Sequence, residues 1–398
     1  MVGGPRTTKQ HAGHERQPEA GLICSAPHIV FSGGGSGGHL TPSLAVAEQI
    51  RSIDRSARVT FFTSGRSVDH RVMQESAVCQ DLLVSVVPLP LVRLPGRRLT
   101  AAPADAWRCW RSLRIGLRYL RKNPVSVMLG TGAFASLPGL LAAKRLRIPT
   151  VLFEANVATG GTNRWMAGGA DIRLTGWPTE ATDSGWEVVG IPIRSTFGQD
   201  SANTERFAGT QPSRHALLIT GGSQGARRLN QIVCEALEQL NIPKNWSVLH
   251  QTGPETELAP GGSVERPNVT TTPFIKDMAT VLDQASLVIS RAGAVTLAEI
   301  AASGCPSILI PLSSAADSHQ ARNAALFVNS GAASVISEQN GNAPGILAEQ
   351  LRRLFIAPAS LRLMSENARS LHTPGAAERI AERLLQVASC PLQSNNTA

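Results

Sequence analysis

The chain has 398 residues, of which 42% are hydrophobic and 17% charged, and its formal net charge is +9. This length predicts two domains, each with enough residues for a buried core, and the composition excludes wholesale disorder, collagen and a coiled coil. The six cysteines lie at least 30 residues apart, so they indicate neither a zinc site nor a disulfide framework and favour a reducing compartment.

The chain begins with a polar segment and continues with a glycine-rich turn. Residues 1–27 lack the continuous apolar core of a signal peptide, so we predict a disordered tail there. A strand near residues 28–32 leads into the turn Gly34-Gly35-Ser36-Gly37-Gly38 and then into a helical pattern. Glycines allow a tight turn, and the N-terminus of the helix offers free N–H groups and a positive dipole to a ligand.

The first turn matches the dinucleotide-binding pattern Gly-x-Gly-x-x-Gly, which also requires an acidic residue at the end of the second strand. That strand, near residues 59–63, is followed by Ser64-Gly65-Arg66, which disfavours NAD and leaves NADP open only through Arg66. His39 stands where a nucleotide-binding Walker A motif needs lysine, and the sequence has no Asp-x-Asp motif. We therefore expect neither a cofactor nor a metal.

The positive charge is concentrated between Leu91 and Lys122. This window holds nine basic residues and one acid, a net +8, whereas the other 366 residues hold 29 basic and 28 acidic side chains. Apolar residues recur there at helical spacing, and a series of arginines repeats that spacing about 100° round the helix. Either the helix packs on a sheet with a solvated basic edge, or it contacts an anionic membrane surface. The residues of the second interpretation are Trp107, Arg108, Trp110, Arg111, Arg114, Arg118 and Arg121.

An uncharged stretch of 19 residues, from Val125 to Ala143, is nominally long enough for a transmembrane helix. Because Gly130, Gly132 and Pro138 would break such a helix, we predict a buried strand, a glycine loop and a helix instead, and no membrane span.

The distribution of charge also bears on nucleic-acid binding. The positive charge of this chain is confined to one segment, whereas a protein that binds nucleic acid over its whole surface would carry it throughout, so we expect no nucleic-acid partner.

The second half of the chain repeats the plan of the first. Residues 215–237 comprise an apolar strand, the turn Gly221-Gly222-Ser223-Gln224-Gly225 and a helix, 187 residues after the first copy. Strands and helices alternate around both copies, which predicts right-handed βαβ units and parallel sheets. We therefore predict an α/β protein with two Rossmann-like domains that face a cleft, in which the last helix completes the second domain or packs back on the first. The expected segments are the domain 28–176, the linker 177–197, the domain 198–387 and the flexible tail 388–398.

Two polar motifs follow strands of the second half. After the strand near residues 287–290, we expect a helix to begin near Thr296, where Thr296-x-x-Glu299 matches a capping box. The capping role explains both residues; alternatively, Glu299 points into the cleft and accepts both hydroxyls of a ribose. The strand near 307–312 is followed by Asp317-Ser318-His319-Gln320, either a plain connection or a ligand-binding loop at the sheet edge.

Seven motifs in order along the chain resemble those of the MurG-type glycosyltransferases: GGGSGGHLTPSLAVA, GIPIR, ITGGSQGARRLN, HQTG, FIKDMATVL, SRAGAVTLAEIAASGCPSILIPL and DSHQARNA. The resemblance extends from about His28 to Ala333. It implies a GT-B fold and transfer of N-acetylglucosamine from its UDP donor to undecaprenyl-pyrophosphoryl-muramoyl-pentapeptide in peptidoglycan synthesis. It further implies inversion at the anomeric carbon, no metal, and a peripheral position on the cytoplasmic face of the inner membrane.

The resemblance also implies roles for individual residues. The donor would lie mostly on the second domain, with its diphosphate near Arg194 and Ser223, its uracil at the backbone of Ile275 and its ribose at Glu299. The other positions that match donor contacts are Ser36, Gly37, Gly38, Asn156, Ala294, Val295, Thr296, Leu297, Ala298 and, on the sugar hydroxyls, Gln320. The sequence departs from the family pattern mainly on the acceptor side, at Gly132-Ala133-Phe134, Phe153-Glu154-Ala155-Asn156 and Ile191.

The chemistry requires a base, because the acceptor hydroxyl must lose a proton as it attacks the anomeric carbon. His39 is the first candidate and Glu154 the second, although His39 could instead cap the helix or bind the acceptor pyrophosphate. Helix N-termini and Arg194 would stabilise the leaving UDP. A UDP-sugar 2-epimerase, another UDP-hexose transferase of this fold and an NADP-dependent oxidoreductase are the alternatives, and the epimerase leaves the basic helix without a role.

Overall fold

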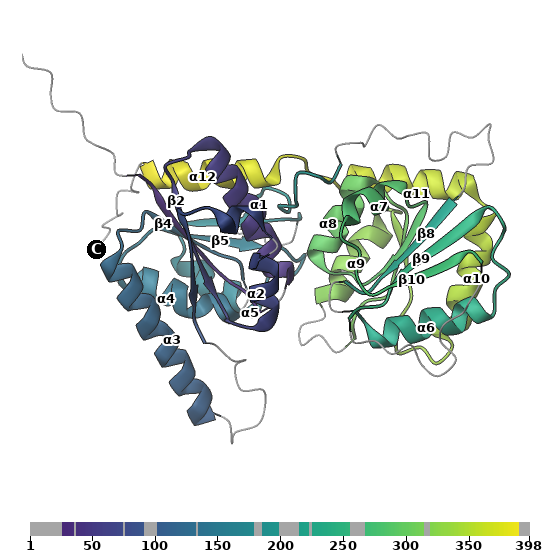
Figure 1. Cartoon of the computed structure of the whole chain (residues 1–398), viewed down its shortest axis with the longest axis horizontal. Coiled ribbons are helices and arrows are strands. Elements are labelled where there is room, and N and C mark those ends of the chain that lie inside the picture. Colours follow the sequence, from purple (N-terminus) through teal and green to yellow (C-terminus); the bar gives the residue numbers. More distant parts are fainter. Residues whose placement is uncertain are drawn as a thin grey trace, which may run out of the picture.

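A computed structural model describes residues 26–389 except 36, 75, 91–101, 133, 179–184, 199–214, 223–224, 255–266 and 314–318. These residues form two α/β domains that lie side by side, each built on a parallel sheet with helices on both faces (Figure 1). The predicted architecture of two Rossmann-like domains is therefore confirmed. The expected tails 1–27 and 388–398 lie almost wholly outside the described residues.

The first domain has a sheet in the order β3-β2-β1-β4-β5-β6-β7. The strands are β1 (His28–Ser32), β2 (Arg58–Thr63), β3 (Val84–Pro88), β4 (Val127–Gly130), β5 (Thr150–Glu154), β6 (Ile172–Thr175) and β7 (Glu187–Val188). Alternate residues of β1 enter different cores, Ile29 and Phe31 on one face and Val30 on the other. Burial of both faces explains why the central strands are almost continuously apolar.

The helices of this domain follow the predicted alternation. They are α1 (Gly37–Ile53), α2 (Ser67–Gln74), α3 (Ala102–Lys122), α4 (Leu137–Arg145) and α5 (Gly161–Met166), with 3-10 turns at Ala77–Gln80, Phe134–Ser136 and Ala167–Gly169. The uncharged stretch from Val125 to Ala143 contains β4, a turn and the start of α4, as predicted. None of the helices that the structure describes is long and apolar enough to cross a membrane.

The second domain has a sheet in the order β10-β9-β8-β11-β12-β13. The strands are β8 (His215–Thr220), β9 (Trp246–Gln251), β10 (Val269–Thr272), β11 (Leu287–Ser290), β12 (Ser307–Leu309) and β13 (Ala333–Val335). The helices that cover this sheet are α6 (Arg227–Glu238), α7 (Met278–Gln284), α8 (Ala294–Ser303), α9 (His319–Asn329), α10 (Ala343–Phe355) and α11 (Pro358–Ser370).

Two connections tie the domains together. Helix α12 (Ala376–Ser389) leaves the second domain and packs on α1 of the first, where Ile380 and Leu384 are fully buried (Figure 1). Its Arg379 donates a hydrogen bond of 2.8 Å to the carbonyl of Val189. Strand β7 lies inside the predicted linker and extends the first sheet. The sequence did not predict this strand, because its two residues have exposed side chains and form no apolar pattern.

Candidate functional site

The two glycine-rich turns occupy equivalent places in the two sheets. Each follows a central strand. Strand β1 lies between β2 and β4, and β8 lies between β9 and β11, so the chain first adds strands on one side of the central strand and then on the other. Open α/β sheets bind ligands at such points. The backbone φ angles are +139° at Gly34, +86° at Gly35, +84° at Gly222 and +71° at Gly225, a region that favours glycine. A Cβ at Gly225 would also overlap the carbonyl oxygen of Thr252, so the turn requires glycine there.

Parts of both turns lie outside the described residues, including Ser36 and Ser223, which the resemblance assigns to the donor. Gly37 and Gly38 form the first turn of α1, and a Cβ at Gly38 would meet open space. The surroundings of Gly38 therefore leave its backbone accessible to a ligand.

A buried aspartate holds the first turn in place. Oδ1 of Asp69 accepts a hydrogen bond from the backbone N–H of Gly35 at 2.9 Å, and Oδ2 accepts from the N–H and hydroxyl of Ser64 at 2.9 and 2.5 Å. These bonds join the loop after β1 to the loop after β2. Asp69 was not predicted from the sequence, because it belongs to no motif. The one sign of its role in the sequence is an acidic residue soon after a strand, and many surface helices carry such a residue.

His39, the predicted base, lies in the first turn of α1 and is half-buried. Its Nδ1 is 3.1 Å from the carbonyl oxygen of Thr131, and because a carbonyl only accepts, Nδ1 carries a proton and Nε2 is the basic atom of the neutral ring. Burial lowers the pKa of His39, and the nearby charge of Glu154 and the bond to Thr131 oppose that effect. The charge of His319 in the second domain lowers this pKa further, so His39 lies within electrostatic reach of the opposite half of the site.

Glu154, the second predicted base, ends β5 and is 4% exposed. Its Oε1 accepts hydrogen bonds from the backbone and side-chain nitrogens of Asn156, both at 3.0 Å. Its Oε2 accepts from the backbone N–H of Gly160 at 2.8 Å and from Nδ2 of Asn163 at 2.9 Å. A carboxylate has about four acceptor positions, and here four donors use them, so the geometry favours Glu154 as the group that holds this loop and His39 as the base.

An asparagine pair joins the two domains. Asn323 on α9 is fully buried; its Oδ1 accepts from the backbone N–H of Val157 at 2.9 Å, and its Nδ2 donates to Oδ1 of Asn156 at 3.1 Å. The same Nδ2 lies 3.2 Å from the carbonyl oxygen of Ala292, just before α8. The loop after β5 is thus fixed to the loop after β11, with Asn156, a predicted donor contact, in the connection.

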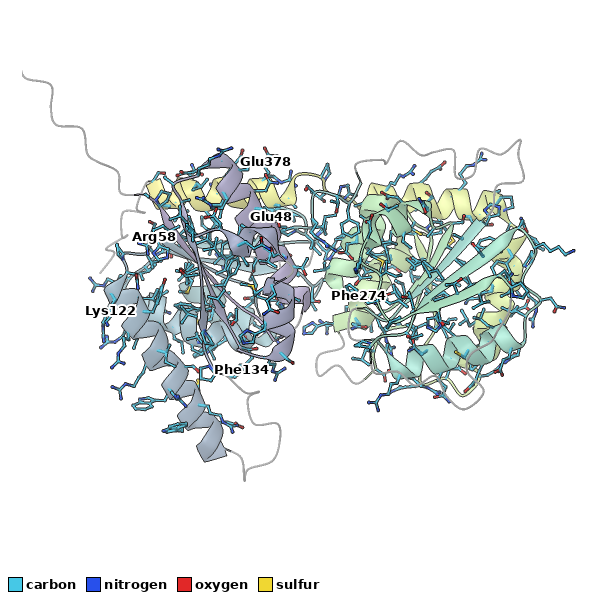
Figure 2. All side chains as sticks on the ribbon, in the orientation of Figure 1. Glu48, Arg58, Lys122, Phe134, Phe274 and Glu378 are labelled. Atoms are coloured by element: carbon cyan, nitrogen blue, oxygen red, sulfur yellow. The ribbon has the colours of Figure 1, made fainter. Side chains whose placement is uncertain are left out.

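Arg194 of the linker is exposed, and its guanidinium centre lies 5.7 Å from the ring of Phe197. Its positive charge acts on Glu48 of α1 and on Glu299 of α8, one carboxylate from each domain. Burial raises the pKa of Glu299 to about 7 in spite of that charge. Figure 2 labels Glu48 and Phe274 on the facing sides of the two domains, and the predicted uracil contact Ile275 adjoins Phe274 and is buried.

Helix α8 begins earlier than predicted, at Ala294 rather than near Thr296. Gly293 is its N-cap residue, in an extended conformation, and among the described residues no side chain caps this end. Thr296 is therefore the third residue of the helix, and the capping-box interpretation of Thr296 and Glu299 is wrong. A glycine N-cap is only a few tenths of a kcal/mol worse than a good capping side chain, so the helix can begin before the threonine.

The remaining predicted donor contacts divide by burial. Four of them are buried in the hydrophobic core and can present only backbone to a ligand, namely Ala294, Val295, Leu297 and Ala298. Thr296 and Glu299 keep part of their side chains exposed. Gln320 is half-buried at the start of α9, and its Oε1 accepts a hydrogen bond from the backbone N–H of Leu312 at 2.9 Å. Asp317 and Ser318 of the same motif lie outside the described residues.

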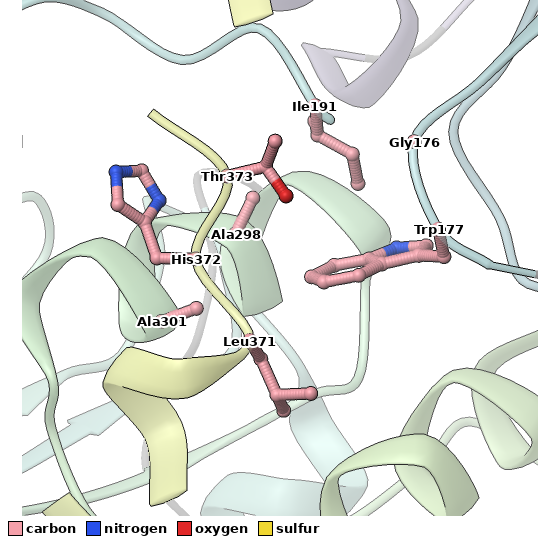
Figure 3. Close-up of a pocket in the computed structure, with 8 residues that line it drawn as sticks. All are labelled: Gly176, Trp177, Ile191, Ala298, Ala301, Leu371, His372 and Thr373. Atoms are coloured by element: carbon pink, nitrogen blue, oxygen red, sulfur yellow. The ribbon is translucent and has the colours of Figure 1, made fainter. Parts of the chain in front are cut away.

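A small cavity marks the hinge between the domains rather than a substrate site (Figure 3). Its volume of about 10 Å³ is enough for about one water molecule. It is lined by Gly176, Trp177, Ile191, Ala298, Ala301, Leu371, His372 and Thr373. Ala298 and Ala301 belong to α8, and the other six residues lie near the two points at which the chain passes between the domains.

Helix α3 packs on the first domain through part of its length and has an exposed basic edge. Trp107 and Trp110 are 55% and 51% exposed, and the guanidinium groups of Arg111 and Arg114 lie 5.5 and 4.7 Å from their ring centres. Farther along the same stripe, leucines pack into the core of the first domain, namely Leu113, Leu117 and Leu120. The helix is therefore anchored through its C-terminal half and presents tryptophan and arginine to solvent through its N-terminal half. Arg108, Arg118 and Arg121 are also exposed.

Among the described residues there is no group of three histidine, cysteine or carboxylate side chains suited to hold a metal ion.

Models of two protein families match the chain. The glycosyltransferase family 28 N-terminal domain matches residues 29–172, and the glycosyltransferase family 28 C-terminal domain matches residues 216–384. Together these matches cover most of the chain and leave residues 173–215, which include the linker, between them.

Several known proteins are similar to the chain over nearly its whole length. UDP-N-acetylglucosamine--N-acetylmuramyl-(pentapeptide) pyrophosphoryl-undecaprenol N-acetylglucosamine transferase from Xanthomonas campestris pv. campestris (strain B100) is 37% identical, over 95% of this chain and 86% of that protein. The protein of the same name from Mycobacterium avium (strain 104) is 33% identical, over 92% and 91%. The crystal structure of Acinetobacter baumannii MurG has 26% identity and a TM-score of 0.73, over 90% and 99%. A putative UDP-N-acetylglucosamine 2-epimerase from Listeria monocytogenes, at 12% identity, a TM-score of 0.60 and coverage of 89% and 95%, shares the fold alone.

Proposed function

Because the chain belongs to the MurG family of glycosyltransferases, we propose that it converts lipid I to lipid II in peptidoglycan synthesis. In this reaction N-acetylglucosamine passes from UDP-N-acetylglucosamine to the muramoyl 4-hydroxyl of undecaprenyl-pyrophosphoryl-muramoyl-pentapeptide. The resemblance inferred from the seven motifs is confirmed at the level of the family and the GT-B fold. The observation that carries the proposal is the meeting of two half-sites at the Asn156–Asn323 contact, one with the histidine His39 and one with the half-buried carboxylate Glu299.

The donor is assigned to the second domain on electrostatic grounds. The first N–H groups of α8 and the charge of Arg194 would stabilise the diphosphate, in the ground state and as UDP leaves. Glu299, in the second turn of the same helix, would accept hydrogen bonds from the ribose hydroxyls. Gln320 would donate to the hydroxyls of the transferred sugar, and the backbone of Ile275 would meet the uracil.

Proton removal is assigned to His39. Its Nδ1–H is held by Thr131, which orients Nε2 to take the proton of the muramoyl 4-hydroxyl as the oxygen attacks the anomeric carbon. Attack opposite the departing UDP inverts the anomeric configuration through an oxocarbenium-like transition state. Glu154 keeps the loop beside the acceptor in place, and its charge would stabilise the imidazolium that forms.

The lipid acceptor requires the enzyme at a membrane, and α3 is the surface best suited to bind one. Exposed tryptophans favour the interface between water and lipid, and arginines favour anionic head groups. Stacking of Arg111 and Arg114 on Trp107 and Trp110 holds both kinds of group on one face. We place this peripheral contact on the cytoplasmic face of the inner membrane.

The decisive experiment follows labelled N-acetylglucosamine from UDP-N-acetylglucosamine into a lipid I analogue, with the donor alone as the control. Label should enter the lipid, UDP should be released in equal amount, and a chelator such as EDTA should leave the rate unchanged. A 2-epimerase would convert the donor to the 2-epimeric sugar nucleotide without any acceptor, and that result would overturn the proposal.

A further inference from the structure

A buried ion pair lies behind the part of the site that faces the donor sugar. Arg291 follows β11 and Glu338 follows β13, and a guanidinium nitrogen lies 2.7 Å from a carboxylate oxygen. The side chains are 10% and 7% exposed. Because β12 lies between β11 and β13, the pair spans the carboxyl end of β12. Burial of two charges away from water is costly, and well-packed apolar residues at the same positions often stabilise a protein as much as an ion pair does. A contribution to stability is therefore a weak explanation for the presence of this pair.

The hydrogen bonds of the pair are directed to the segment that leaves β12. Arg291 donates to the carbonyl oxygen of Ile310 at 2.9 Å. Oε1 of Glu338 accepts from the backbone N–H of Ser313 at 2.7 Å and from its hydroxyl at 2.5 Å. Although burial alone would raise the pKa of Glu338, the hydrogen bonds from Ser313 and Arg291 outweigh it and lower the pKa, so this carboxylate is ionised at neutral pH. Both ends of residues 310–313 are therefore fixed by one pair of charges.

The fixed segment in turn orients Gln320. The backbone N–H of Leu312, next to Ser313, donates to Oε1 of Gln320 at 2.9 Å. A backbone N–H can only donate, so the atom that faces it must be the amide oxygen, which leaves the amide Nε2 to donate to a ligand. Any shift of Leu312 would rotate or release this amide.

We propose that Glu338 is a positioning residue for donor selection, which orients Gln320 toward the sugar hydroxyls through Ser313 and Leu312. This inference rests on the proposed function, because it takes Gln320 to contact the transferred sugar. Glu338 acts at a distance and touches no part of the donor. Its loss therefore weakens donor binding and the discrimination between sugars that differ in the direction of one hydroxyl, and it leaves acceptor binding unchanged.

The test compares Glu338→Gln with Glu349→Gln, a control in the same domain whose carboxylate forms exposed ion pairs with Arg352 and Arg353. Isothermal titration calorimetry would measure the affinity for UDP-N-acetylglucosamine and for UDP-N-acetylgalactosamine, and transfer to a lipid I analogue would give kcat and both KM values. Glu338→Gln should weaken binding of the first donor about tenfold, the loss typical of one charge-assisted hydrogen bond, and should reduce the preference for it. Acceptor KM and the affinities of the Glu349→Gln control should match the parent protein.

A double-mutant cycle tests whether Glu338 acts through Gln320. In a Gln320→Ala background, Glu338→Gln should change donor affinity by less than about twofold, because coupled residues are not additive. Equal effects of Glu338→Gln with and without Gln320 would overturn the proposal, as would an unchanged donor affinity and preference in folded Glu338→Gln.

Glu338→Gln leaves a buried Arg291 with a weakened partner and risks misfolding, so Ser313→Ala provides a second route. It removes one hydroxyl and keeps both charges paired, and it should weaken donor binding about threefold, less than Glu338→Gln, because the backbone N–H of Ser313 still donates to Oε1 of Glu338. If Glu338→Gln does not fold, normal donor affinity and preference in Ser313→Ala contradict the proposal. Absence of transfer by the parent protein would contradict the proposed function instead, while calorimetry still reports on Glu338.

Discussion

The two domains share one plan, yet they hold their ligand loops with different chemistry. In the first domain, carboxylates secure the loops: Asp69 binds the N–H groups of Gly35 and Ser64, and Glu154 binds those of Asn156 and Gly160. These N–H groups are occupied, and negative charge lies behind them.

In the second domain, the described contacts of the glycine-rich turn come from neutral groups. Gln251 donates to the carbonyl oxygen of Gly222 at 3.0 Å, and the hydroxyl of Thr220 accepts from the N–H of Gly222 at 3.1 Å. Asn230 donates to the carbonyl oxygen of Thr252 at 2.8 Å. A loop held by neutral groups keeps its attraction for an anion, which supports the proposal that the UDP diphosphate binds on the second domain and that proton transfer occurs on the first.

Replacement of His39 should produce the largest effect, and it tests the first half of this comparison. His39→Ala should reduce kcat at least ~100-fold, the usual contribution of a general base, while calorimetric affinity for UDP-N-acetylglucosamine changes less than about threefold. In the parent protein the lowered pKa of His39 should keep kcat constant through neutral pH and allow it to fall only in acid. His70→Ala, which removes an exposed histidine on α2, is the matched control. Normal turnover by His39→Ala would remove His39 from the mechanism.

The second effect in size concerns the charge that distinguishes the first domain. We expect replacement of five arginines of α3 by glutamine to reduce co-flotation with vesicles of anionic phospholipid at least ~10-fold, since each basic residue near such a surface contributes about 1 kcal/mol. The replaced residues are Arg108, Arg111, Arg114, Arg118 and Arg121. Calorimetric affinity for the donor should not change. The control replaces Arg352 and Arg353 on α10 of the second domain, and equal loss in both variants would contradict a specific role for α3.

Local patterns predicted the sheets and missed the residues that join distant loops. Apolar runs bounded by glycine located β1 and β8, because a strand buried on both faces needs such a run. Asn323, by contrast, contacts Asn156 across 167 residues of sequence. Nothing nearby in the chain distinguishes a buried asparagine of this kind from one on a surface helix.

The start of α8 shows the same limit at short range. The pattern Thr296-x-x-Glu299 satisfies a capping box, and local energetics alone favour that choice. The tertiary structure begins the helix at Ala294 instead and leaves Glu299 half-buried beside Arg194. The resemblance predicts which residues form the candidate site, whereas the contacts that position them became visible only in the fold.

Two carboxylates, Glu299 of the second domain and Glu48 of the first, both lie within reach of the charge of Arg194, so their roles in donor binding can be compared directly. The pKa of Glu299 is about 7, so its ionised, hydrogen-bond-accepting form is lost as the pH falls below 7. Donor affinity should then decrease by up to about tenfold per pH unit, since the diphosphate diester of the donor does not titrate in this range. Calorimetry between pH 5.5 and 8 measures this slope. Glu299→Gln should flatten it, and Glu48→Gln should retain it; a slope that survives in Glu299→Gln would exclude Glu299 as the ribose acceptor.

The smallest effect concerns stability, where the two domains should behave alike. Burial and the charge of Arg58 lower the pKa of His28 on β1 to about 4, and burial lowers that of His250 on β9 to about 4. Between pH 6.5 and 4 the unfolded chain binds these protons and the folded domains do not. Each histidine should therefore lower the free energy of unfolding by roughly 1 kcal/mol per unit of pH decrease in that window.

Differential scanning calorimetry can assign this loss of stability to each domain. His28→Gln should reduce the pH dependence of the transition of the first domain, and His250→Gln that of the second, with each variant serving as the control for the other. The effect should vanish above pH 7, where each histidine is neutral in both the folded and the unfolded chain. A pH dependence that His28→Gln and His250→Gln both leave intact would show that other groups, and not these buried imidazoles, make the two domains sensitive to acid.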